Sequence, residues 1–230
     1  YDHRKLKDNK RIRVAIFLMF SYQHHCGNFK NFISESDLDY IVKRMEKLDS
    51  IPVPEGSCHG IDINYTDMYD WFVENVLDRL REYTQRPDLN LIYGFLGNMT
   101  RSFKIHRDVK TIPEKEHNPR GTQFASFLIP VSVDFDPNKC CVNSTMIFDK
   151  NVLKNPADNL DWHYKVKDIN PIYYYDNHGW IDHRHYNLID EYKWGRGDLI
   201  WWNSLYPHCG LDNNVLGIKT KQMLVIHTYV

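Results

Sequence analysis

Apolar residues recur with two different periods along the chain, and the change of period separates a helical part from a strand-rich part. From Ser36 onward apolar residues return every three or four positions, which predicts a helix with Ser36 and Asp39 as its capping box. The same spacing over residues 67–83 predicts a second helix, with Thr66 as its cap. The segment 51–60 holds two prolines and two glycines, and therefore predicts a loop between the two helices.

Short apolar and aromatic runs bounded by turn residues follow the helices and predict strands. The expected strands are 89–96, 102–107, 123–135, 144–149, 198–202 and 222–230. Before the helices we expect a buried strand at 13–20 and a short extended piece at 28–34 that ends in a helix cap. Pro130 lies inside the longest run and predicts either an edge strand or a bulge, because proline cannot donate to a sheet ladder.

Two helices followed by some eight short strands predict a mainly β (α+β) fold. We expect a double-stranded β-helix, or jelly roll, of two sheets braced by the two N-terminal helices. The chain of 230 residues predicts a single domain, 1–230. Residues 151–190 are rich in Asn, Asp, His and Tyr with weak periodicity, which predicts an insertion over one rim of the sheets, with at most a strand at 172–175.

Charge and cysteine content narrow the class of protein. The formal net charge of -1 gives no global field that would favour nucleic acid, although a local basic patch stays open. The five cysteines form an odd set without CxxC spacing, which favours a reduced, intracellular and therefore cytoplasmic protein. No apolar run reaches the roughly 18 residues of a membrane span, so we expect no membrane partner. The sequence begins at Tyr1, so a removed targeting segment also stays open.

Two histidines and one aspartate form the candidate site. His106 and Asp108 are two positions apart, so both side chains project from one face of an extended chain. His208 follows the apolar run 198–202 about a hundred residues later. Together they match the 2-His-1-carboxylate set that holds non-haem Fe(II) and leaves coordination positions open. The HxD pair alone is weak evidence, because the segment 182–185 offers similar pairs, and the strand context is what favours His106 and Asp108.

Six segments carry a resemblance to the 2-oxoglutarate/Fe(II)-dependent dioxygenase superfamily, closest to its prolyl-hydroxylase-like and small phage and bacterial members. They are NFISESDLDYIV, KIHRD, FLIPVSVDF, GRGDLIWWN, YPHCG and GIKTKQMLVIHTY. The resemblance covers about Asn28 to Val230, but residues 151–190 do not match. It implies that His106, Asp108 and His208 bind the iron.

The resemblance also implies a hydroxylase. Its cofactors would be Fe(II), the co-substrate 2-oxoglutarate and O2, with ascorbate as a stimulant. The products would be succinate, CO2 and a hydroxylated small molecule or peptide, and no nucleic-acid partner is indicated. Two alternatives stay open: a cupin-like metalloenzyme that uses no keto acid, and a catalytically inactive jelly-roll binding module.

A basic residue opening the last strand would bind the distal carboxylate of 2-oxoglutarate, and Tyr93 resembles a tyrosine of the co-substrate pocket, although a core tyrosine is equally consistent. Lys219 and Lys221 follow His208 by 11 and 13 positions, whereas the family spacing is about nine or ten, so the spacing does not choose between them. Lys221 continues directly into the apolar run, whereas Lys219 lies near the turn at Gly217. We therefore expect Lys221 to lie deeper and to carry the role.

Overall fold

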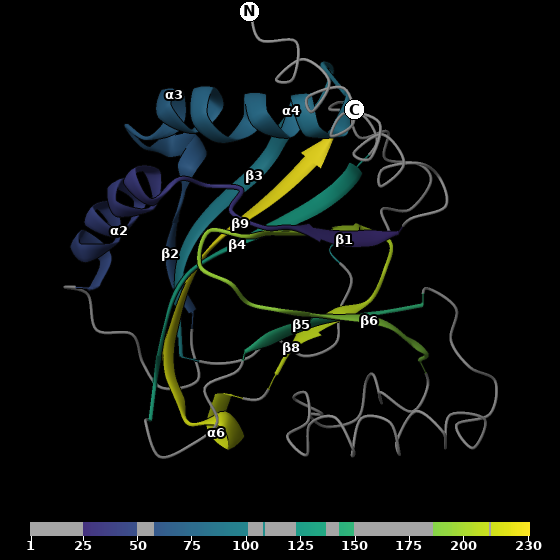
Figure 1. Cartoon of the computed structure of the whole chain (residues 1–230). Helices are drawn as coiled ribbons and strands as arrows, with labels where there is room; N and C mark the ends of the chain where they lie inside the picture. The colour runs from purple at the N-terminus through teal and green to yellow at the C-terminus, as the bar shows by residue number, and fades with distance from the viewer. Residues whose placement is uncertain are drawn as a thin grey trace, which may run out of the picture.

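The computed structural model describes residues 25–49, 58–100, 108, 123–136, 143–149, 186–211 and 213–230. Within these residues the strands form two antiparallel sheets, with helices covering the outer face of the larger one (Figure 1). This arrangement confirms the predicted mainly β jelly roll, or double-stranded β-helix, with helices bracing one side. None of the described helices combines the length and the apolar character needed to cross a membrane.

The larger sheet has the order β1-β7-β4-β9-β3-β2 and the smaller sheet has the order β6-β5-β8. The strands of the larger sheet are β1 (Cys26–Phe29), β2 (Cys58–Asp62), β3 (Asn90–Met99), β4 (Gln123–Phe135), β7 (Leu199–Asn203) and β9 (Ile218–Tyr229). Those of the smaller sheet are β5 (Ser144–Phe148), β6 (Leu188–Lys193) and β8 (His208–Gly210). The strand before His208 and the strand that contains it therefore lie in different sheets.

Two helical segments pack on the larger sheet. The first is α2 (Glu35–Asp49), and the second runs through η1 (Ile63–Tyr65), α3 (Tyr69–Phe72), the π-helix η2 (Val73–Leu77) and α4 (Asp78–Thr84). A short helix, α6 (Asn213–Leu216), precedes β9. The helices bury one apolar face against the sheet, which is the reason for their three- and four-residue spacing.

Both faces of the central strands are buried, which explains why their sequences are continuously apolar rather than alternating. One face packs against the helices through side chains such as Phe127, Trp201 and Leu224. The opposite face packs toward the smaller sheet through side chains such as Trp202 and Met223. Adjacent residues of one strand therefore pack into two different cores. Only the core that faces the smaller sheet borders the cavity described below.

The structure corrects the predicted capping residues of the two helices. Helix α2 begins at Glu35, and Ser34 rather than Ser36 caps it, because the Asp37 N–H donates to the Ser34 hydroxyl at 3.2 Å. Ser36 instead shares a hydroxyl contact with Ser34 at 2.9 Å. The predicted cap Thr66 accepts the Met68 N–H at 3.2 Å, but it ends η1, whereas α3 begins at Tyr69 with Met68 at its N-cap position and no side-chain cap.

Three strands were missed by the sequence patterns: β2, β6 and the short β8. The predicted loop 51–60 gives way to strand β2 at Cys58, and β6 lies partly inside the segment expected to be an insertion. Pro130 lies in β4, which is a central strand, so the predicted edge position is wrong and the alternative of a bulge is confirmed by a register shift between Pro130 and Ser132. The expected strands 13–20, 102–107 and 172–175 and residues 151–185 of the expected insertion lie outside the described residues.

A buried carboxylate fixes the entry to β7. Asp198 accepts hydrogen bonds from the Lys30 ammonium at 2.6 Å and the Asn31 N–H at 3.0 Å. Gly197, with a left-handed φ of 76°, donates its N–H to the carbonyl of Pro130 at 2.9 Å. The turn before β7 is therefore tied to the end of β1 and to the bulge in β4.

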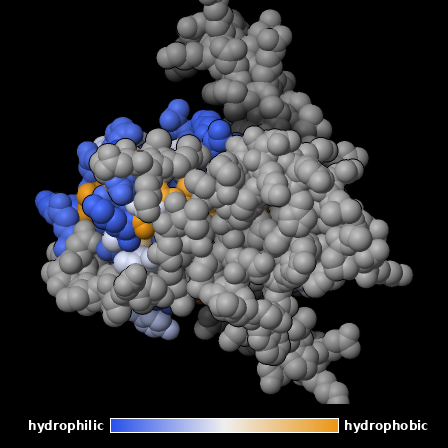
Figure 2. Space-filling view, turned by 90° about the horizontal axis from the view of Figure 1, so that it is seen from below, coloured by the Kyte–Doolittle hydropathy of each residue, from blue (hydrophilic) through white to orange (hydrophobic). Residues whose placement is uncertain are grey.

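The surface that is visible from below is mostly hydrophilic where it is described. In Figure 2 the coloured side chains are largely blue, and hydrophobic ones show between them in only a few places. The apolar side chains of the described segments are mainly buried, and the large ones that remain exposed are Tyr65, Tyr69, Ile189 and Leu205. This distribution is ordinary for a folded domain and directs attention to the interior.

Two glycines make room for an aromatic side chain in the larger sheet. Gly97 on β3 pairs with Gly60 on β2, and the Phe95 ring lies over both of them. A Cβ atom at either glycine would stand well inside contact distance of that ring. Gly94, by contrast, would place a Cβ atom 3.5 Å from the Ile63 side chain, an ordinary contact.

Gly97→Ala should therefore displace the Phe95 ring and lower the free energy of unfolding by about 1–3 kcal/mol, the usual cost of overpacking. Gly94→Ala is the matched control on the same strand and should stay within about 0.5 kcal/mol of the unsubstituted protein. Urea unfolding of both variants measures the difference. Equal stabilities for the two variants would contradict this packing account.

Candidate functional site

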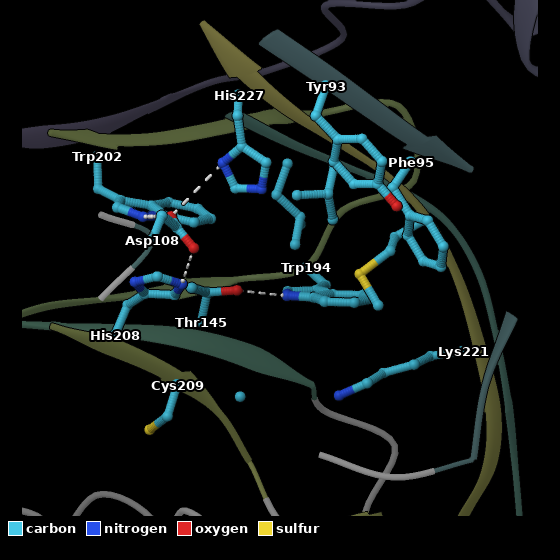
Figure 3. A pocket seen from close by; sticks show the side chains of 14 residues that line it. Tyr93, Phe95, Asp108, Thr145, Trp194, Trp202, His208, Cys209, Lys221 and His227 are labelled. Carbon is cyan, nitrogen blue, oxygen red and sulfur yellow. Dashed lines mark hydrogen bonds and ion pairs between the residues drawn. The ribbon is translucent and has the colours of Figure 1, made fainter. Parts of the chain in front are cut away.

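A cavity of about 310 Å³ lies between the two sheets. Figure 3 shows the side chains that line it, which come from β3, β4, β7 and β9 of the larger sheet, from β5 and β8 of the smaller sheet, and from Asp108 and Trp194 outside the strands. Along β9 the lining residues are Lys221, Met223, Val225 and His227. Their spacing of two follows from the alternation of a strand, so one face of β9 forms a wall of the cavity.

Asp108 and His208 meet inside this cavity. The Asp108 Oδ1 atom lies 3.6 Å from His208 Nε2, and the two side chains are only 8% and 7% exposed. The His208 Nδ1 atom is 3.3 Å from the carbonyl oxygen of Tyr206. A carbonyl can only accept, so this contact assigns a proton to Nδ1, and in the neutral imidazole the lone pair then lies on Nε2.

A cation fits the gap between these two atoms. In this tautomer a carboxylate oxygen and an unprotonated imidazole nitrogen face each other in a largely dry space, an arrangement that repels unless a cation or proton stands between them. Two ligands of one ion with bonds of about 2.1 Å are about 3.0–3.4 Å apart at angles of 90–110°. The observed 3.6 Å is close to that range.

A row of paired residues crosses the larger sheet beneath Asp108. Cys26, Trp202, Ser126, His227 and Tyr93 are register partners in turn on β1, β7, β4, β9 and β3. We refer to these five residues as the cross-strand row.

Two members of the cross-strand row approach the second Asp108 oxygen. The Trp202 indole N–H donates to Oδ2 at 2.9 Å, and His227 Nδ1 lies 3.8 Å from it (Figure 3). His227 Nδ1 is also 2.9 Å from the hydroxyl of Ser126. The row therefore holds one oxygen of the carboxylate, while the other oxygen faces His208.

A buried ammonium lies away from Asp108 in the same cavity. Lys221 is 2% exposed, and its Nζ atom lies 5.4 Å from the centroid of the Trp194 ring, within the range of a cation–π contact. The Trp194 N–H in turn donates to the Thr145 hydroxyl at 2.9 Å. A Cβ atom at Gly210 would come within 3.1 Å of the Lys221 Nζ atom, so glycine gives the ammonium its space.

Tyr93 and Cys209 are two further residues beside the cavity. Tyr93 lines the cavity and stacks with His227 at 6.1 Å and with Phe95 at 6.0 Å between ring centroids. Cys209 is buried, and that burial raises the pKa of its thiol, although the nearby Lys221 ammonium acts in the opposite direction. The thiol is therefore protonated at neutral pH and suited to packing rather than to binding a metal.

The sequence analysis placed most of these residues but not all of them. Asp108, His208, Lys221 and Tyr93 share one cavity, and the prediction that Lys221 lies deeper than Lys219 is confirmed, because Lys219 is exposed. His106 lies outside the described residues. Within the described part of the chain, no set of three His, Cys, Asp or Glu side chains has the arrangement of a metal site.

The sequence analysis gave no site role to several lining residues, among them Phe95, Thr145, Trp194 and Trp202. Thr145 gave no signal, because it lies in a short, wholly buried strand. Trp202 is adjacent to Trp201, and only the alternation of β7 could have indicated that one indole faces the cavity side and the other the helices.

Comparison with known proteins identifies the fold. No protein-family model matches this sequence, and a search of curated protein sequences found no significant match. Solved structures do match. A prolyl-4-hydroxylase of Pseudomonas putida matches with a TM-score of 0.55 and 11% identity, over 95% of this chain and 99% of that one.

Two further solved structures also match this chain. The non-haem alpha-ketoglutarate-dependent epimerase SnoN of nogalamycin biosynthesis has a TM-score of 0.60 at 9% identity, over 94% of this chain and 83% of that one. HygX of Streptomyces hygroscopicus, with nickel and 2-oxoglutarate bound, has a TM-score of 0.51 at 11% identity, over 95% and 86% of the two chains. At such identities the similarity shows a shared fold, the double-stranded β-helix.

Proposed function

We propose that this protein is an Fe(II)- and 2-oxoglutarate-dependent dioxygenase. It would hydroxylate a C–H bond of a small molecule or peptide and release succinate and CO2. One observation carries the proposal: Asp108 Oδ1 and His208 Nε2 face each other across 3.6 Å in a cavity that also holds the buried ammonium of Lys221. A metal-binding pair and a desolvated cation in one space suit a cofactor and an anionic co-substrate together.

Asp108 and His208 would hold the iron together with His106, which precedes Asp108 by two positions. When bound, the iron supplies the activation of O2 that the side chains cannot perform. The contribution of the chain is to fix its ligands. The Tyr206 carbonyl sets the tautomer of His208, and the cross-strand row holds the Asp108 carboxylate.

Lys221 would bind the distal carboxylate of 2-oxoglutarate. An ammonium that is 2% exposed is largely without water, so an anionic partner there gains a strong electrostatic contact. The Thr145 hydroxyl accepts the Trp194 N–H and can donate its own proton to the same carboxylate. Tyr93 would close the neighbouring wall of the pocket.

The comparisons support this proposal over its alternatives. SnoN is an alpha-ketoglutarate-dependent enzyme, and HygX was solved with 2-oxoglutarate bound. A cupin-like metalloenzyme without a keto acid would have no need for a buried lysine beside the metal site. A binding module without turnover would have no need for the facing pair of Asp108 and His208. Succinate release, screened against pooled small molecules and peptides, tests the activity directly.

Replacing Asp108 with alanine should abolish binding of Fe(II) and all turnover, because the variant lacks the carboxylate that faces His208. Anaerobic titration of Fe(II) into the apoprotein measures the affinity. Asp134→Ala, at a carboxylate on β4 that does not line the cavity, is the control and should bind Fe(II) normally. Normal binding by Asp108→Ala would show that the ligand assignment is wrong.

Lys221→Ala should raise the apparent Michaelis constant for 2-oxoglutarate on the order of 100-fold, because a desolvated ion pair is lost. Lys219→Ala is the matched control on the same strand and should change it little, since Lys219 is exposed. Succinate release at varied 2-oxoglutarate concentration measures both values. The reverse ranking would move the role to Lys219, and no effect in either variant would favour the metalloenzyme without a keto acid.

A further inference from the structure

The Trp202 side chain contacts both of the residues that face each other in the cavity. Its indole N–H donates to Asp108 Oδ2 at 2.9 Å. Its ring system packs on the imidazole of His208, with 4.3 Å between centroids and 40° between planes. Trp202 is itself 2% exposed, so packing holds the indole in place. One side chain therefore limits the movement of both groups.

The contact with Asp108 distinguishes its two oxygens. Oδ2 receives the Trp202 N–H, whereas Oδ1 is the atom that lies 3.6 Å from His208 Nε2. Rotation of the carboxylate would exchange the two oxygens only if this hydrogen bond broke. A charge-assisted hydrogen bond in a dry site is costly to break, so the contact favours a single orientation.

An indole suits this task for two chemical reasons. Its nitrogen is a donor only, so it can hold an oxygen of Asp108 but cannot bind a cation in competition with it. Its backbone is also fixed, because Trp202 pairs with Cys26 of β1 on one side and with Ser126 of β4 on the other. The donor is therefore delivered from the middle of a sheet rather than from a loop.

The short turn between Trp202 and His208 completes the arrangement. The Tyr206 N–H donates to the Asn203 carbonyl at 2.9 Å, and the Leu205 N–H donates to the Asn203 side-chain oxygen at 3.0 Å. The same turn presents the Tyr206 carbonyl to His208 Nδ1 at 3.3 Å. Strand, turn and imidazole thus form a connected unit that ends on the face of the Trp202 indole.

We propose that Trp202 is a positioning residue for a metal centre. Its N–H restrains Asp108 so that only Oδ1 is offered beside His208 Nε2, and its ring fixes the plane of the His208 imidazole. This inference rests on the proposed function, because it assumes that Asp108 and His208 hold a metal ion. It goes further in assigning to Trp202 a role in metal affinity and ligand geometry that is separate from core packing.

The test compares Trp202→Phe with Trp201→Phe. Phenylalanine at 202 retains an aromatic ring against His208 but removes the N–H donor. The control lies next to it on β7, where Trp201 is buried against the helices, so both variants lose one indole from the same strand. Binding of Co(II) to each apoprotein is followed by titration and by visible absorption, which reports the ligand geometry independently of turnover.

Trp202→Phe should weaken Co(II) binding on the order of 10-fold and alter its visible spectrum, as loss of a partner that orients a metal ligand typically does. Trp201→Phe should leave both unchanged even if it lowers stability. Wild-type affinity and spectrum in Trp202→Phe would overturn the positioning role alone. If the unsubstituted protein binds no Co(II), Fe(II) or Zn(II), the proposed function fails and this inference fails with it.

A second measurement needs no substitution and applies even if Trp202→Phe does not fold. The NMR resonance of the Trp202 indole N–H, assigned in the labelled protein, should shift when the diamagnetic probe Zn(II) is added. The reason is that the N–H donates to the Asp108 carboxylate, whose charge a bound metal ion would partly neutralise. The resonance of Trp201 should stay in place. A Trp202 resonance that does not respond to a saturating metal ion would overturn the proposal.

Discussion

The structure is governed by the need to keep opposite charges in a space from which two packed sheets exclude most water. Asp108 and Lys221 both reach this space, with the Asp108 side chain 8% exposed and Lys221 2% exposed. An isolated charge in such surroundings costs several kcal/mol, so each needs polar or aromatic neighbours. For Asp108 these include an indole N–H, and for Lys221 they include the face of another indole. The tryptophans therefore solvate charge as well as fill volume.

The scaffold meets this need through its central strands. The cross-strand row runs through β4, whose neighbours β7 and β9 carry the indole and imidazole members that approach Asp108. The bulge at Pro130 and the buried Asp198 hold the start of β7 in register with β4 and β1. A slip of one residue in β7 would turn Trp202 to the opposite face of the sheet and withdraw its N–H from Asp108. The Asp198 contacts, which look purely structural, thus determine which indole reaches Asp108.

The sequence predicted the parts of the fold in which a strong pattern and a long segment coincide. The run 123–135 became β4 without change, because a strand-forming pattern that continues over thirteen residues leaves little ambiguity. Strand β2 was missed because its sequence, CHGID, mixes small and polar residues without a pattern, and β6 was missed because much of its LIDEYK sequence faces solvent. The sequence left the cap of the first helix between Ser34 and Ser36, because the two serines are equally good caps on composition, and the structure uses Ser34.

The sequence predicted the parts of the candidate site that depend on positions along one strand. It did not predict the parts that depend on contacts between strands far apart in the sequence. The apolar run that continues from Lys221 placed Lys221 inside and Lys219 near the turn, which the burial of each confirms. No local pattern could show that Trp202, rather than its neighbour, faces Asp108, or that Thr145 and Trp194 meet, since these pairs are separated by many residues. Those contacts arise only when the two sheets are brought face to face.

The closeness of Lys221 to Trp194 has an optical consequence. A positive charge 5.4 Å from the centre of an indole ring perturbs the energy of its excited state. An anion that neutralises this charge would weaken the perturbation and alter the emission of that single tryptophan. Trp194 is thus a built-in fluorophore at the lysine end of the cavity, and its emission would report occupancy of that end without any attached label.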